Sequence, residues 1–386
     1  MATRADHEHM LPAGFADFQD FREAARRRLP DFIFAYLDGG IGRDANLKRN
    51  RSSLDDVRIE PRINDAPPNV DLSCDLFGHT YDLPVGVAPL GMTSMMHHDS
   101  ATSLARRAAA LNMPMALSLV AGHAMEDVKA ASGRAAWQQL YWPDEQEMKA
   151  SLIERMKRAG VTVAMPTVDI PGWQWRESWV RMGVSTGPNT LQRLKTLAMR
   201  PGWTLDVLRR GGPDMPNLSE IAPGGAAAGE AFLLKHTMRP LGPREIAEFR
   251  DLWDGALVVK GVMAPEDAEI FAGIGVDGIV VSNHGGRQLD AAPGTAEMLP
   301  DIASAVAGRM KVIADGGVWN GLDALRLLRL GADAVMVGRL PYFATAGLGE
   351  SGAAVLDMLS IQVRAQMVQL GVRNLAELRA LRLFGG

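Results

Sequence analysis

Three stretches of the chain repeat one local pattern, and this repeat restricts the possible folds more than any other feature. In each stretch a helical pattern ends at a glycine, a short linker follows, and an apolar run rich in β-branched residues begins. The runs are Val163 to Val168 after Gly160, Gly278 to Ser282 after Gly275, and Ala334 to Gly338 after Gly331. Because they lack in-out alternation, they indicate strands buried on both faces, as in a parallel sheet covered by helices.

The same criteria identify eight strands along the chain, and that number favours a closed barrel. A doubly wound open sheet is the alternative, although such a sheet more often carries a Gly-rich turn after its first strand, and none is evident here. We therefore predict an α/β fold, a TIM (β/α)8 barrel, with residues 1–386 forming one domain. The predicted strands are Val85 to Ala88, Met115 to Leu119, Trp137 to Tyr141, Val163 to Val168, Leu257 to Lys260, Gly278 to Ser282, Lys311 to Ala314 and Ala334 to Gly338.

Two regions fall outside the repeat. Residues 1–80 form an N-terminal helical extension that begins with a helical segment from Phe18 to Leu37, and residues 81–386 form the barrel. Residues 172–240 form an insertion after strand four that is far longer than the usual βα loop. The insertion is rich in Gly and Pro and contains Trp173, Trp175, Trp179 and Trp203. Because a long βα loop lies on the active-site face of a barrel, a lid, a membrane contact and partial disorder are all open alternatives.

Composition excludes some functions and favours one compartment. A net charge of -4 and a pI near 6.1 do not indicate a nucleic-acid partner, whose usual footprint is a basic domain. Cys74 is the only cysteine, so no intrachain disulfide can form and a reducing compartment is expected. The N-terminus lacks the apolar run of a signal peptide. We therefore expect a cytoplasmic protein.

Polar and charged residues stand at the carboxyl ends of the predicted strands, where a TIM barrel places its reactive groups. One such position arises easily by chance, but nearly a full set indicates a shared pocket. The residues are Gln139 and Tyr141 on strand three, Thr167 and Asp169 on strand four, Lys260 on strand five, Ser282, Asn283 and His284 on strand six, Asp315 on strand seven, and Gly338 and Arg339 on strand eight.

The most specific string is Ser282-Asn283-His284-Gly285-Gly286-Arg287-Gln288. A histidine beside glycines is by itself more often a loop residue. The whole string, however, is similar to the signature of the FMN-dependent 2-hydroxy-acid oxidase and dehydrogenase family, and the resemblance extends from about Phe21 to Leu381. It implies an FMN flavoprotein that oxidises an (S)-2-hydroxy acid, and it implies a homotetramer.

The resemblance assigns the substrate site residue by residue. His284 matches the family's catalytic base, and Asp169 matches the carboxylate that pairs with it. Arg176 and Arg287 match the two arginines that hold the substrate carboxylate, a task for which guanidinium forks suit better than ammonium groups. Tyr36 and Tyr141 resemble the tyrosines that hydrogen-bond the substrate, although a helical Tyr36 packed in the core is the plain alternative. No metal is expected.

The FMN site is also matched. Pro89, Leu90 and Gly91 resemble the segment that lies against the flavin ring, Ser118, Gln139, Thr167 and Ser282 match polar contacts, and Lys260 matches the cation at the N1/O2 edge of the flavin. The expected phosphate end consists of Asp315, Gly316, Gly317, Gly338 and Arg339, with glycine-rich turns and a helix N-terminus. One position departs from the family: Trp319 stands where an arginine usually contacts the phosphate, so FMN binding is expected to depend more on Arg339 and backbone amides.

Several functional questions stay open from sequence. The electron acceptor is a quinone or oxygen, and the long insertion favours a dehydrogenase that contacts the inner face of the cell membrane through residues 172–240. Val120, where glycolate oxidase has a tryptophan, suggests room for lactate or an aryl-substituted acid such as mandelate, unless other loop residues refill the space. A different class of function also uses the strand seven and eight site: a non-redox aldolase or isomerase acting on a phosphorylated substrate. It leaves Arg176, Arg287 and Tyr141 without a joint purpose.

Overall fold

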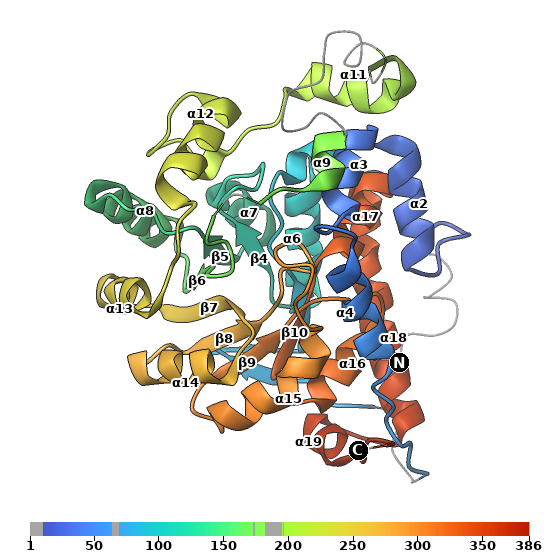
Figure 1. Cartoon of the computed structure of the whole chain (residues 1–386). Helices are drawn as coiled ribbons and strands as arrows, with labels where there is room; N and C mark the ends of the chain where they lie inside the picture. Colours follow the sequence, from blue (N-terminus) through green and yellow to red (C-terminus); the bar gives the residue numbers. More distant parts are fainter. Residues whose placement is uncertain (1–10, 64–68, 173, 182–194, 196, 386) are drawn as a thin grey trace.

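Eight parallel strands form a closed barrel in the computed structural model, which describes residues 11–63, 69–172, 174–181, 195 and 197–385 (Figure 1). The sheet order is β3-β10-β9-β8-β7-β6-β5-β4, and a parallel bridge between Val87 and Met115 joins the two end strands. This closure confirms the TIM barrel and excludes the open sheet. The strands are β3 (Val85–Val87), β4 (Ala116–Ser118), β5 (Trp137–Leu140), β6 (Val163–Pro166), β7 (Ala256–Val262), β8 (Gly278–Val281), β9 (Lys311–Ala314) and β10 (Ala334–Val337).

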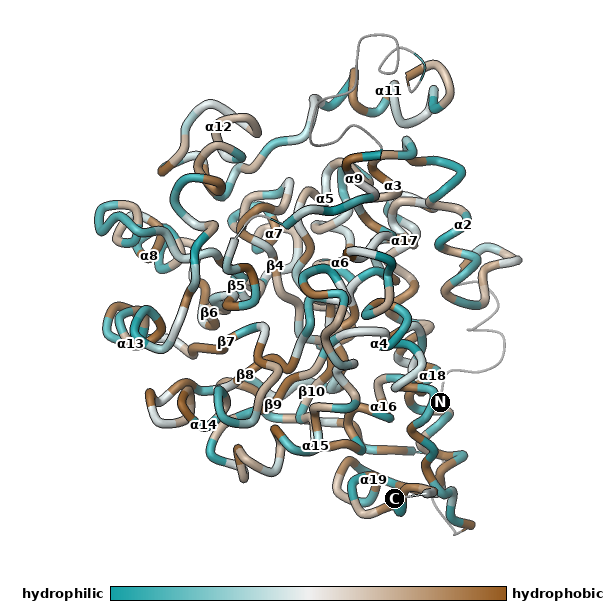
Figure 2. Tube along the Cα trace, viewed as in Figure 1, coloured by the Kyte–Doolittle hydropathy of each residue, from teal (hydrophilic) through white to brown (hydrophobic). Residues whose placement is uncertain are grey.

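Helices surround the barrel, and the strands between them are apolar, as the brown segments of Figure 2 show. The glycines of the repeat do what the pattern predicts, since Gly160 and Gly275 end their helices in the left-handed conformation. The surrounding helices are α5 (Thr93–Met96), α6 (Ser100–Ala110), α7 (Met125–Ser132), α8 (Gln146–Ala159), α13 (Pro243–Leu252), α14 (Pro265–Ile274), α15 (Thr295–Val306), α16 (Gly321–Arg329), α17 (Arg339–Leu348), η3 (Gly349–Ala354), α18 (Val355–Leu370) and α19 (Leu375–Ala380).

A hairpin of β1 (Cys74–Leu76) and β2 (His79–Tyr81) joins the core inside the barrel. Leu76 and Tyr81 are buried there, and the indole nitrogen of Trp137 donates to the Tyr81 hydroxyl at 3.1 Å. Phe77 reaches Gly278 at the start of β8, so closely that a side chain on Gly278 would meet its ring. The hairpin therefore packs against the amino-terminal ends of the strands, and the reactive groups lie at the opposite ends.

The N-terminal extension contains three helices, α2 (Phe18–Arg28), α3 (Asp31–Asp38) and α4 (Ala45–Asp55). The prediction of one helical segment from Phe18 to Leu37 is wrong, because the chain breaks at Leu29-Pro30. Proline has no N–H to continue a helix and forces the preceding residue out of the helical region; Leu29 accordingly has ψ 147°. Helix α2 packs on α17, and α3 carries Tyr36 toward the barrel.

The insertion has two described parts with different burial. Its inner part, residues 214–237, contains η1 (Pro216–Leu218), α12 (Gly225–Phe232) and the π-helix η2 (Leu233–Thr237), and it buries Met215, Leu218 and Phe232. Its outer part, residues 197–210, contains α11 (Pro201–Arg210), which buries no residue. Between β6 and these parts lies the short helix α9 (Glu177–Arg181). Trp173 lies outside the described residues.

Candidate active site at the strand ends

His284 follows β8 in a conformation that a side chain rarely adopts. Its φ is +57°, and the next two residues, Gly285 and Gly286, are also left-handed. The backbone N–H of His284 donates to the Ser282 hydroxyl at 3.1 Å, which secures this turn. The imidazole Nδ1 lies 3.0 Å from one carboxylate oxygen of Asp169. Because an ionised carboxylate only accepts, Nδ1 carries the proton and Nε2 is left as the basic atom.

A bulge in β7 places Asp169 against this histidine. Strand pairing shifts register between Lys260 and Val262, and the residue between them, Gly261, has φ +104°. A Cβ on Gly261 would lie 2.6 Å from the Asp169 carboxyl carbon, so only glycine leaves room for the carboxylate. Sequence reasoning missed Gly261, although a lone glycine inside a strand pattern is a known sign of a bulge or close approach.

Electrostatics keep this pair as a neutral imidazole beside an ionised carboxylate. Burial lowers the pKa of His284, and the charge of Lys260 lowers it further, while Asp169 offsets only part of the effect. Burial alone would raise the pKa of Asp169. At the low pH where Asp169 titrates, however, His284 is protonated, and its charge and that of Lys260 outweigh burial and hold the pKa of Asp169 below its ordinary value. His284 is therefore unprotonated at neutral pH and available as a base.

Lys260 lies in β7 just before the bulge at Gly261, with its ammonium group buried among acceptors. Its side chain is 5% exposed, and Nζ lies 3.0 Å from the Ser282 hydroxyl and 3.5 Å from Asp315 Oδ2. Ser282 in turn donates to Asp315 Oδ1 at 2.5 Å. Asp315, which the resemblance groups with the phosphate end, thus directs its carboxylate at Lys260. The burial of Lys260 consequently has a counter-charge and is not by itself a sign of function.

Two arginines and two tyrosines lie around the His284-Asp169 pair. Burial, together with the nearby charge of Arg287, lowers the pKa of Arg176 to about 10. Burial likewise lowers the pKa of Arg287, which donates to the carbonyl of Tyr36 at 2.6 Å and stacks on its ring. Burial raises the pKa of Tyr141, and Tyr36, Asp169, Arg176 and Arg287 are all close enough to act on it.

The structure therefore brings together every residue predicted for the substrate site. Arg176 comes from the insertion, Arg287 from the loop after β8, Tyr141 from the end of β5 and Tyr36 from α3. Because the two guanidinium charges disfavour each other in a buried setting, a small anion placed between them would be stabilised.

The predicted flavin-ring contacts form a hydrogen-bonded row across three neighbouring strands. Ser118 donates to the Gln139 side chain at 2.7 Å, and Gln139 donates to Thr167 at 2.8 Å. Beside this row Pro89, Leu90 and Gly91 follow β3. A Cβ on Gly91 would lie 2.8 Å from Val120 Cγ2 and 3.0 Å from the Tyr36 hydroxyl oxygen. Gly91 thus lets the side chain of Val120 and the Tyr36 hydroxyl pack closely over the backbone of this segment.

The predicted phosphate end offers backbone donors. Gly316 and Gly317 turn with φ of +102° and +76°, and a Cβ on Gly317 would lie 2.7 Å from the carbonyl oxygen of Asn50. Helix α17 begins after Gly338 with no side-chain cap, which leaves its first N–H groups for an anion. These donors, with Lys260 and the Gln139 row, have the chemistry that FMN requires.

Arg339 and Trp319 have other contacts in this structure. Arg339 donates to the carbonyls of Leu37, Gly39 and Gly285, and burial with the charge of Arg287 lowers its pKa to about 10. Trp319 stacks on Phe18 with ring centroids 4.4 Å apart. The expectation that Arg339 compensates for Trp319 at the phosphate stays untested, and the backbone donors are the groups placed to do so.

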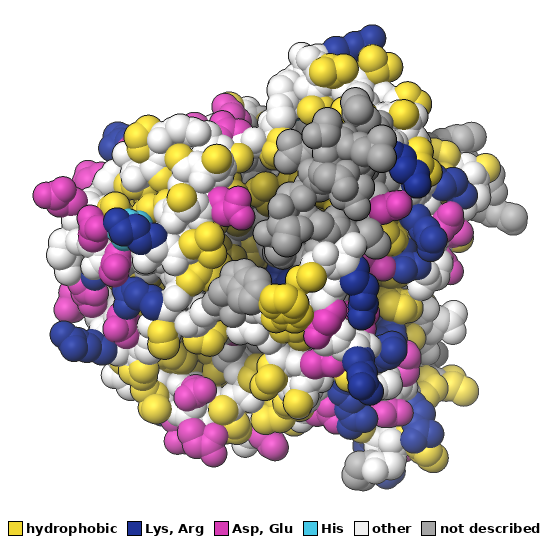
Figure 3. Space-filling view, turned by 45° about the horizontal axis from the view of Figure 1, so that its top comes forward, with side chains coloured by type: hydrophobic (Ala, Val, Ile, Leu, Met, Phe, Trp, Pro, Cys, Tyr) yellow, Lys and Arg dark blue, Asp and Glu magenta, His cyan; other side chains and the backbone are white. Residues whose placement is uncertain are grey.

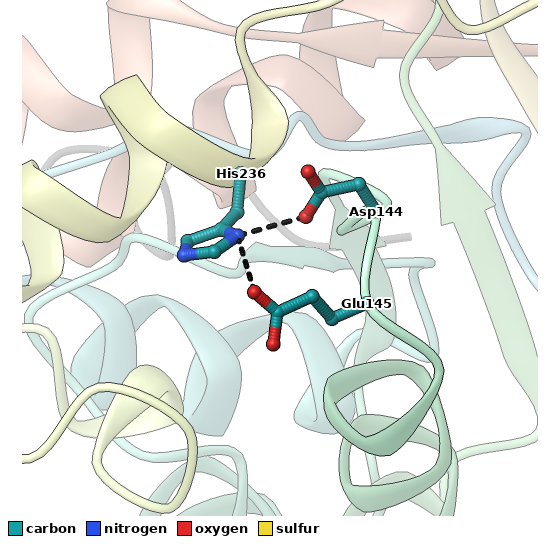
Figure 4. A group of neighbouring side chains, drawn as sticks. All are labelled: Asp144, Glu145 and His236. Carbon is teal, nitrogen blue, oxygen red and sulfur yellow. Dashed lines mark hydrogen bonds and ion pairs between the residues drawn. The ribbon is translucent and has the colours of Figure 1, made fainter.

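A separate cluster links the insertion to the loop after β5. His236 on η2 lies with Nδ1 2.8 Å from Asp144 and 3.5 Å from Glu145 (Figure 4). Within the described part of the chain, these three residues are the group whose geometry could hold a metal ion. Both carboxylates are about half exposed, and hydrogen bonding from His236 lowers the pKa of Asp144. A hydrogen bond between His236 and Asp144 that fastens η2 to the loop after β5 accounts for these contacts.

Comparison with known proteins agrees with this geometry. The sequence profile described as FMN-dependent dehydrogenase matches residues 25–383. An L-lactate dehydrogenase of Caulobacter vibrioides is 41% identical over 368 residues, covering 93% of this chain and 95% of that protein, and one of Ectopseudomonas mendocina is 38% identical over 365 residues, covering 93% and 96%.

Two solved structures are also similar. A mandelate oxidase has a TM-score of 0.80 and 31% identity, covering 96% of this chain and 98% of its own. A structure described as the monotopic membrane protein (S)-mandelate dehydrogenase has a TM-score of 0.90 and 26% identity, covering 96% and 99%. With a family profile matched over almost its whole length, this chain belongs to the FMN-dependent dehydrogenase family.

Proposed function

We propose that the chain oxidises a small (S)-2-hydroxy acid to the 2-oxo acid, with His284 as the base. One observation carries this proposal: the neutral His284, paired with Asp169 at 3.0 Å, lies beside Arg176 and Arg287, and burial together with the charge of Arg287 lowers the pKa of Arg176. A base beside an anion site is the arrangement that a hydroxy acid needs. None of the matched proteins named above is an aldolase or isomerase, so that alternative is dropped.

The substrate carboxylate binds Arg176 and Arg287, because planar guanidinium groups match a carboxylate in two hydrogen bonds. The hydroxyls of Tyr36 and Tyr141 contact the substrate oxygens. Tyr141 stays protonated, since burial raises its pKa, and it can therefore donate. These four groups orient the substrate so that the proton to be removed faces His284.

His284 accepts this proton at Nε2 while Nδ1 keeps its hydrogen bond to Asp169. The new imidazolium charge is stabilised by the Asp169 carboxylate 3.0 Å away. FMN, when bound, supplies the two-electron acceptor for the substrate. Lys260, Ser118, Gln139, Thr167 and the segment Pro89-Leu90-Gly91 would hold its ring, and the Gly316-Gly317 turn with the α17 N-terminus would hold its phosphate. The ammonium group of Lys260 favours negative charge at the ring edge.

Substrate identity is tested by mixing the enzyme anaerobically with glycolate and with each enantiomer of lactate and mandelate. We expect the (S) enantiomers to remove the flavin absorbance near the visible maximum and the (R) enantiomers to leave it. The names of the relatives favour lactate and mandelate, and Val120 leaves more space than a larger side chain would. If the flavin stays oxidised with every hydroxy acid, the proposed function is wrong.

The acceptor we propose is a quinone, in keeping with the dehydrogenase names among the relatives. After anaerobic reduction by substrate, the enzyme is mixed with air-saturated buffer or with a soluble quinone, and reoxidation is followed by absorbance. Fast reoxidation by the quinone and slow reoxidation by air is the expected result. Rapid formation of hydrogen peroxide in air would identify an oxidase instead.

We also propose that the outer part of the insertion contacts an anionic membrane surface. No helix among the described residues is long and apolar enough to cross a bilayer. Helix α11, however, turns Trp203 and Asp206 toward the protein and leaves Leu205 49% and Leu208 76% exposed, next to Arg209. Figure 3 shows hydrophobic side chains beside basic ones at the top of the molecule. An apolar face beside basic residues favours an interfacial membrane position.

Membrane contact is tested by sedimentation with vesicles of phosphatidylglycerol and phosphatidylcholine. We expect binding to the anionic mixture that weakens with salt, and equal amounts of free protein with and without vesicles would contradict the proposal. A cytoplasmic location at the inner membrane face and a homotetramer stay predictions, which cell fractionation and light scattering would measure.

A further inference from the structure

Asn217, in the inner part of the insertion, is a buried side chain bonded to another loop of the site. It lies on η1 and is 1% exposed. Its Oδ1 accepts from the backbone N–H of Met125 at 2.8 Å, and its Nδ2 donates to the carbonyl of His123 at 2.9 Å and lies 3.5 Å from that of Ser118. One side chain of the insertion thus contacts the loop of residues 118–125, which follows β4, at three points.

The first contact supplies a helix cap that α7 lacks. Helix α7 begins after Ala124, whose side chain cannot accept a hydrogen bond. Asn217 Oδ1 accepts from Met125, the first residue of the helix, and so satisfies one of the N–H groups that a helix start leaves open. This role alone would make Asn217 a structural residue.

The other contacts bear on the loop that carries Val120. The backbone N–H of Val120 donates to the Ser118 hydroxyl at 3.3 Å, and its carbonyl accepts from Met92 at 2.8 Å. Its side chain and the Tyr36 hydroxyl both approach within 3.0 Å of the position a Cβ would have on Gly91. Val120 therefore lies beside the Tyr36 hydroxyl, which is one of the predicted substrate contacts.

The inner part of the insertion is itself rigidly held. Arg155 on α8, 7% exposed at its side chain, donates to the Pro216 carbonyl at 2.8 Å and pairs with Glu126 and Glu220. On the loop's other side, His123 bonds Thr93 at 3.2 Å. The loop of residues 118–125 is consequently fixed between α5 and η1, and Asn217 is the residue of η1 that hydrogen-bonds it.

We propose that Asn217 is a positioning residue. By holding the loop of residues 118–125, it fixes the position of Val120 and thereby limits the size of the substrate side chain that the site accepts. This inference rests on the proposed function, because it assumes that the substrate binds beside Tyr36. Loss of the Asn217 bonds would let the loop relax outward, which enlarges the space for the substrate side chain. The affinity and kcat/KM for bulky 2-hydroxy acids should then rise relative to those for small ones.

The test compares Asn217→Ala and Asn217→Asp with the wild-type enzyme. The aspartate keeps the acceptor for Met125 but loses the donor to His123, so it separates the helix cap from the loop contact. Asn374→Ala is the matched control, since Asn374 caps α19, accepting from Glu377 at 2.9 Å, and lies away from the site. Binding of pyruvate and of phenylglyoxylate, a small and a bulky 2-oxo acid, is measured from changes in the flavin spectrum.

We expect both Asn217 variants to shift the ratio of the two dissociation constants toward phenylglyoxylate, by about tenfold, the effect of one or two methylene groups in a pocket. The ratio of kcat/KM for lactate and mandelate should shift the same way, and FMN affinity should stay constant. Asn374→Ala should lower Tm without changing the ratio. If both Asn217 variants lower Tm and leave the ratio unchanged, Asn217 is only a cap and the proposal is wrong.

The proposed function can fail separately. If the wild-type enzyme binds both 2-oxo acids but no hydroxy acid reduces it, the proposed oxidation is wrong while the ratio still decides the role of Asn217. If the flavin spectrum responds to neither 2-oxo acid, the substrate site is not where we place it, and the inference about Asn217 fails with it.

Discussion

Side chains at the strand ends of the barrel are buried and bonded to one another, whereas those on the outer part of the insertion are largely exposed. At the strand ends, His284, Lys260 and Asp315 all contact other polar side chains: His284 bonds Asp169, and Lys260 pairs with Asp315. Burial and the charge of Lys260 lower the pKa of His284, while Asp169 raises it. On α11 no residue is buried, and Leu205 and Leu208 face solvent. The two regions therefore serve separate purposes: the strand ends carry the proposed chemistry, and α11 carries the proposed membrane contact. The strand-end side chains are held by neighbours on every side, whereas α11 is attached by one face and leaves its opposite face exposed.

The sharpest test of this separation removes the base. His284→Ala should lower kcat/KM for the 2-hydroxy acid by about 10²–10⁴-fold, the usual contribution of a general base. Binding of FMN, followed by the quenching of its fluorescence, should change little, because no flavin contact predicted here involves the imidazole. Vesicle binding should be the same as for the wild-type enzyme. Substantial activity in this variant would mean that another group takes the proton.

Replacing Asp169 should give a smaller loss with a defined pH signature. Asp169→Asn removes the charge that stabilises the imidazolium, so we expect kcat to fall by about a hundredfold, in the range of a general-base contribution. Steady-state rates across pH 5 to 9 measure both this loss and the acid limb of the profile, that is, the pH below which the rate falls as His284 becomes protonated. A variant that is active like the wild type would separate Asp169 from the reaction.

The direction of the pH shift follows from the charges around His284. In the wild-type enzyme the pKa of His284 lies below its ordinary value of about 6.5, so kcat/KM should be flat at neutral pH and fall only at lower pH. Asp169 raises this pKa, whereas Lys260 and Arg287 lower it. Removing Asp169 therefore moves the acid limb to still lower pH. A limb that moves upward would contradict the electrostatics described here.

How much of this could be predicted from sequence depends on the range of the contacts involved. The strands were predictable because burial on both faces leaves a continuous apolar run, and the polar residues at the strand ends were predictable because parallel strands end at one edge. Only the family resemblance pointed to the site residues that lie off the strands, which are Tyr36, Arg176 and Arg287. The helix break at Pro30 was indicated by the proline itself, although the surrounding helical pattern outweighed it. Gly261 was indicated only weakly, as a lone glycine in a strand. Asn217 could not be identified from sequence, because its role depends on backbone groups about a hundred residues away along the chain.

The insertion was least predictable for the same reason. Its tryptophans drew attention, yet Trp203 donates from its indole to the carbonyl of Met95 and packs edge-on against Phe32, so it anchors α11 on the protein. Trp175 is 59% exposed, and the leucines of α11 are exposed as well; their orientation depends on which face of that helix Trp203 and Asp206 attach. Because Trp203 and Val207 lie on one side of α11 and its two leucines on the other, its periodicity alone does not decide which side faces outward.

The apolar face of α11 should matter for membrane binding and not for turnover. Leu205→Asp combined with Leu208→Asp should weaken binding to anionic vesicles by about tenfold or more, since each buried leucine contributes about 1.5–3 kcal/mol when fully transferred from water. Turnover with lactate and a soluble acceptor should equal that of the wild type. Leu289→Asp, at an exposed leucine of the loop after β8, is the control for adding a charge elsewhere. Unchanged vesicle binding in the double variant would place the membrane contact on another surface.

The smallest expected effect concerns how α11 is attached. Arg28 on α2 pairs with Asp206 on α11, and Arg210 pairs with Asp99 at 2.7 Å, with side chains between 24% and 47% exposed. Pairs at such partly exposed positions contribute about 0.2–1 kcal/mol, so a double-mutant cycle with Arg28→Ala and Asp206→Ala should give a coupling energy in that range from urea unfolding. The coupling should shrink in high salt, and kcat should not change. A coupling well above that range, or a change in turnover, would mean that α11 is part of the catalytic scaffold, and the separation between the two regions would no longer hold.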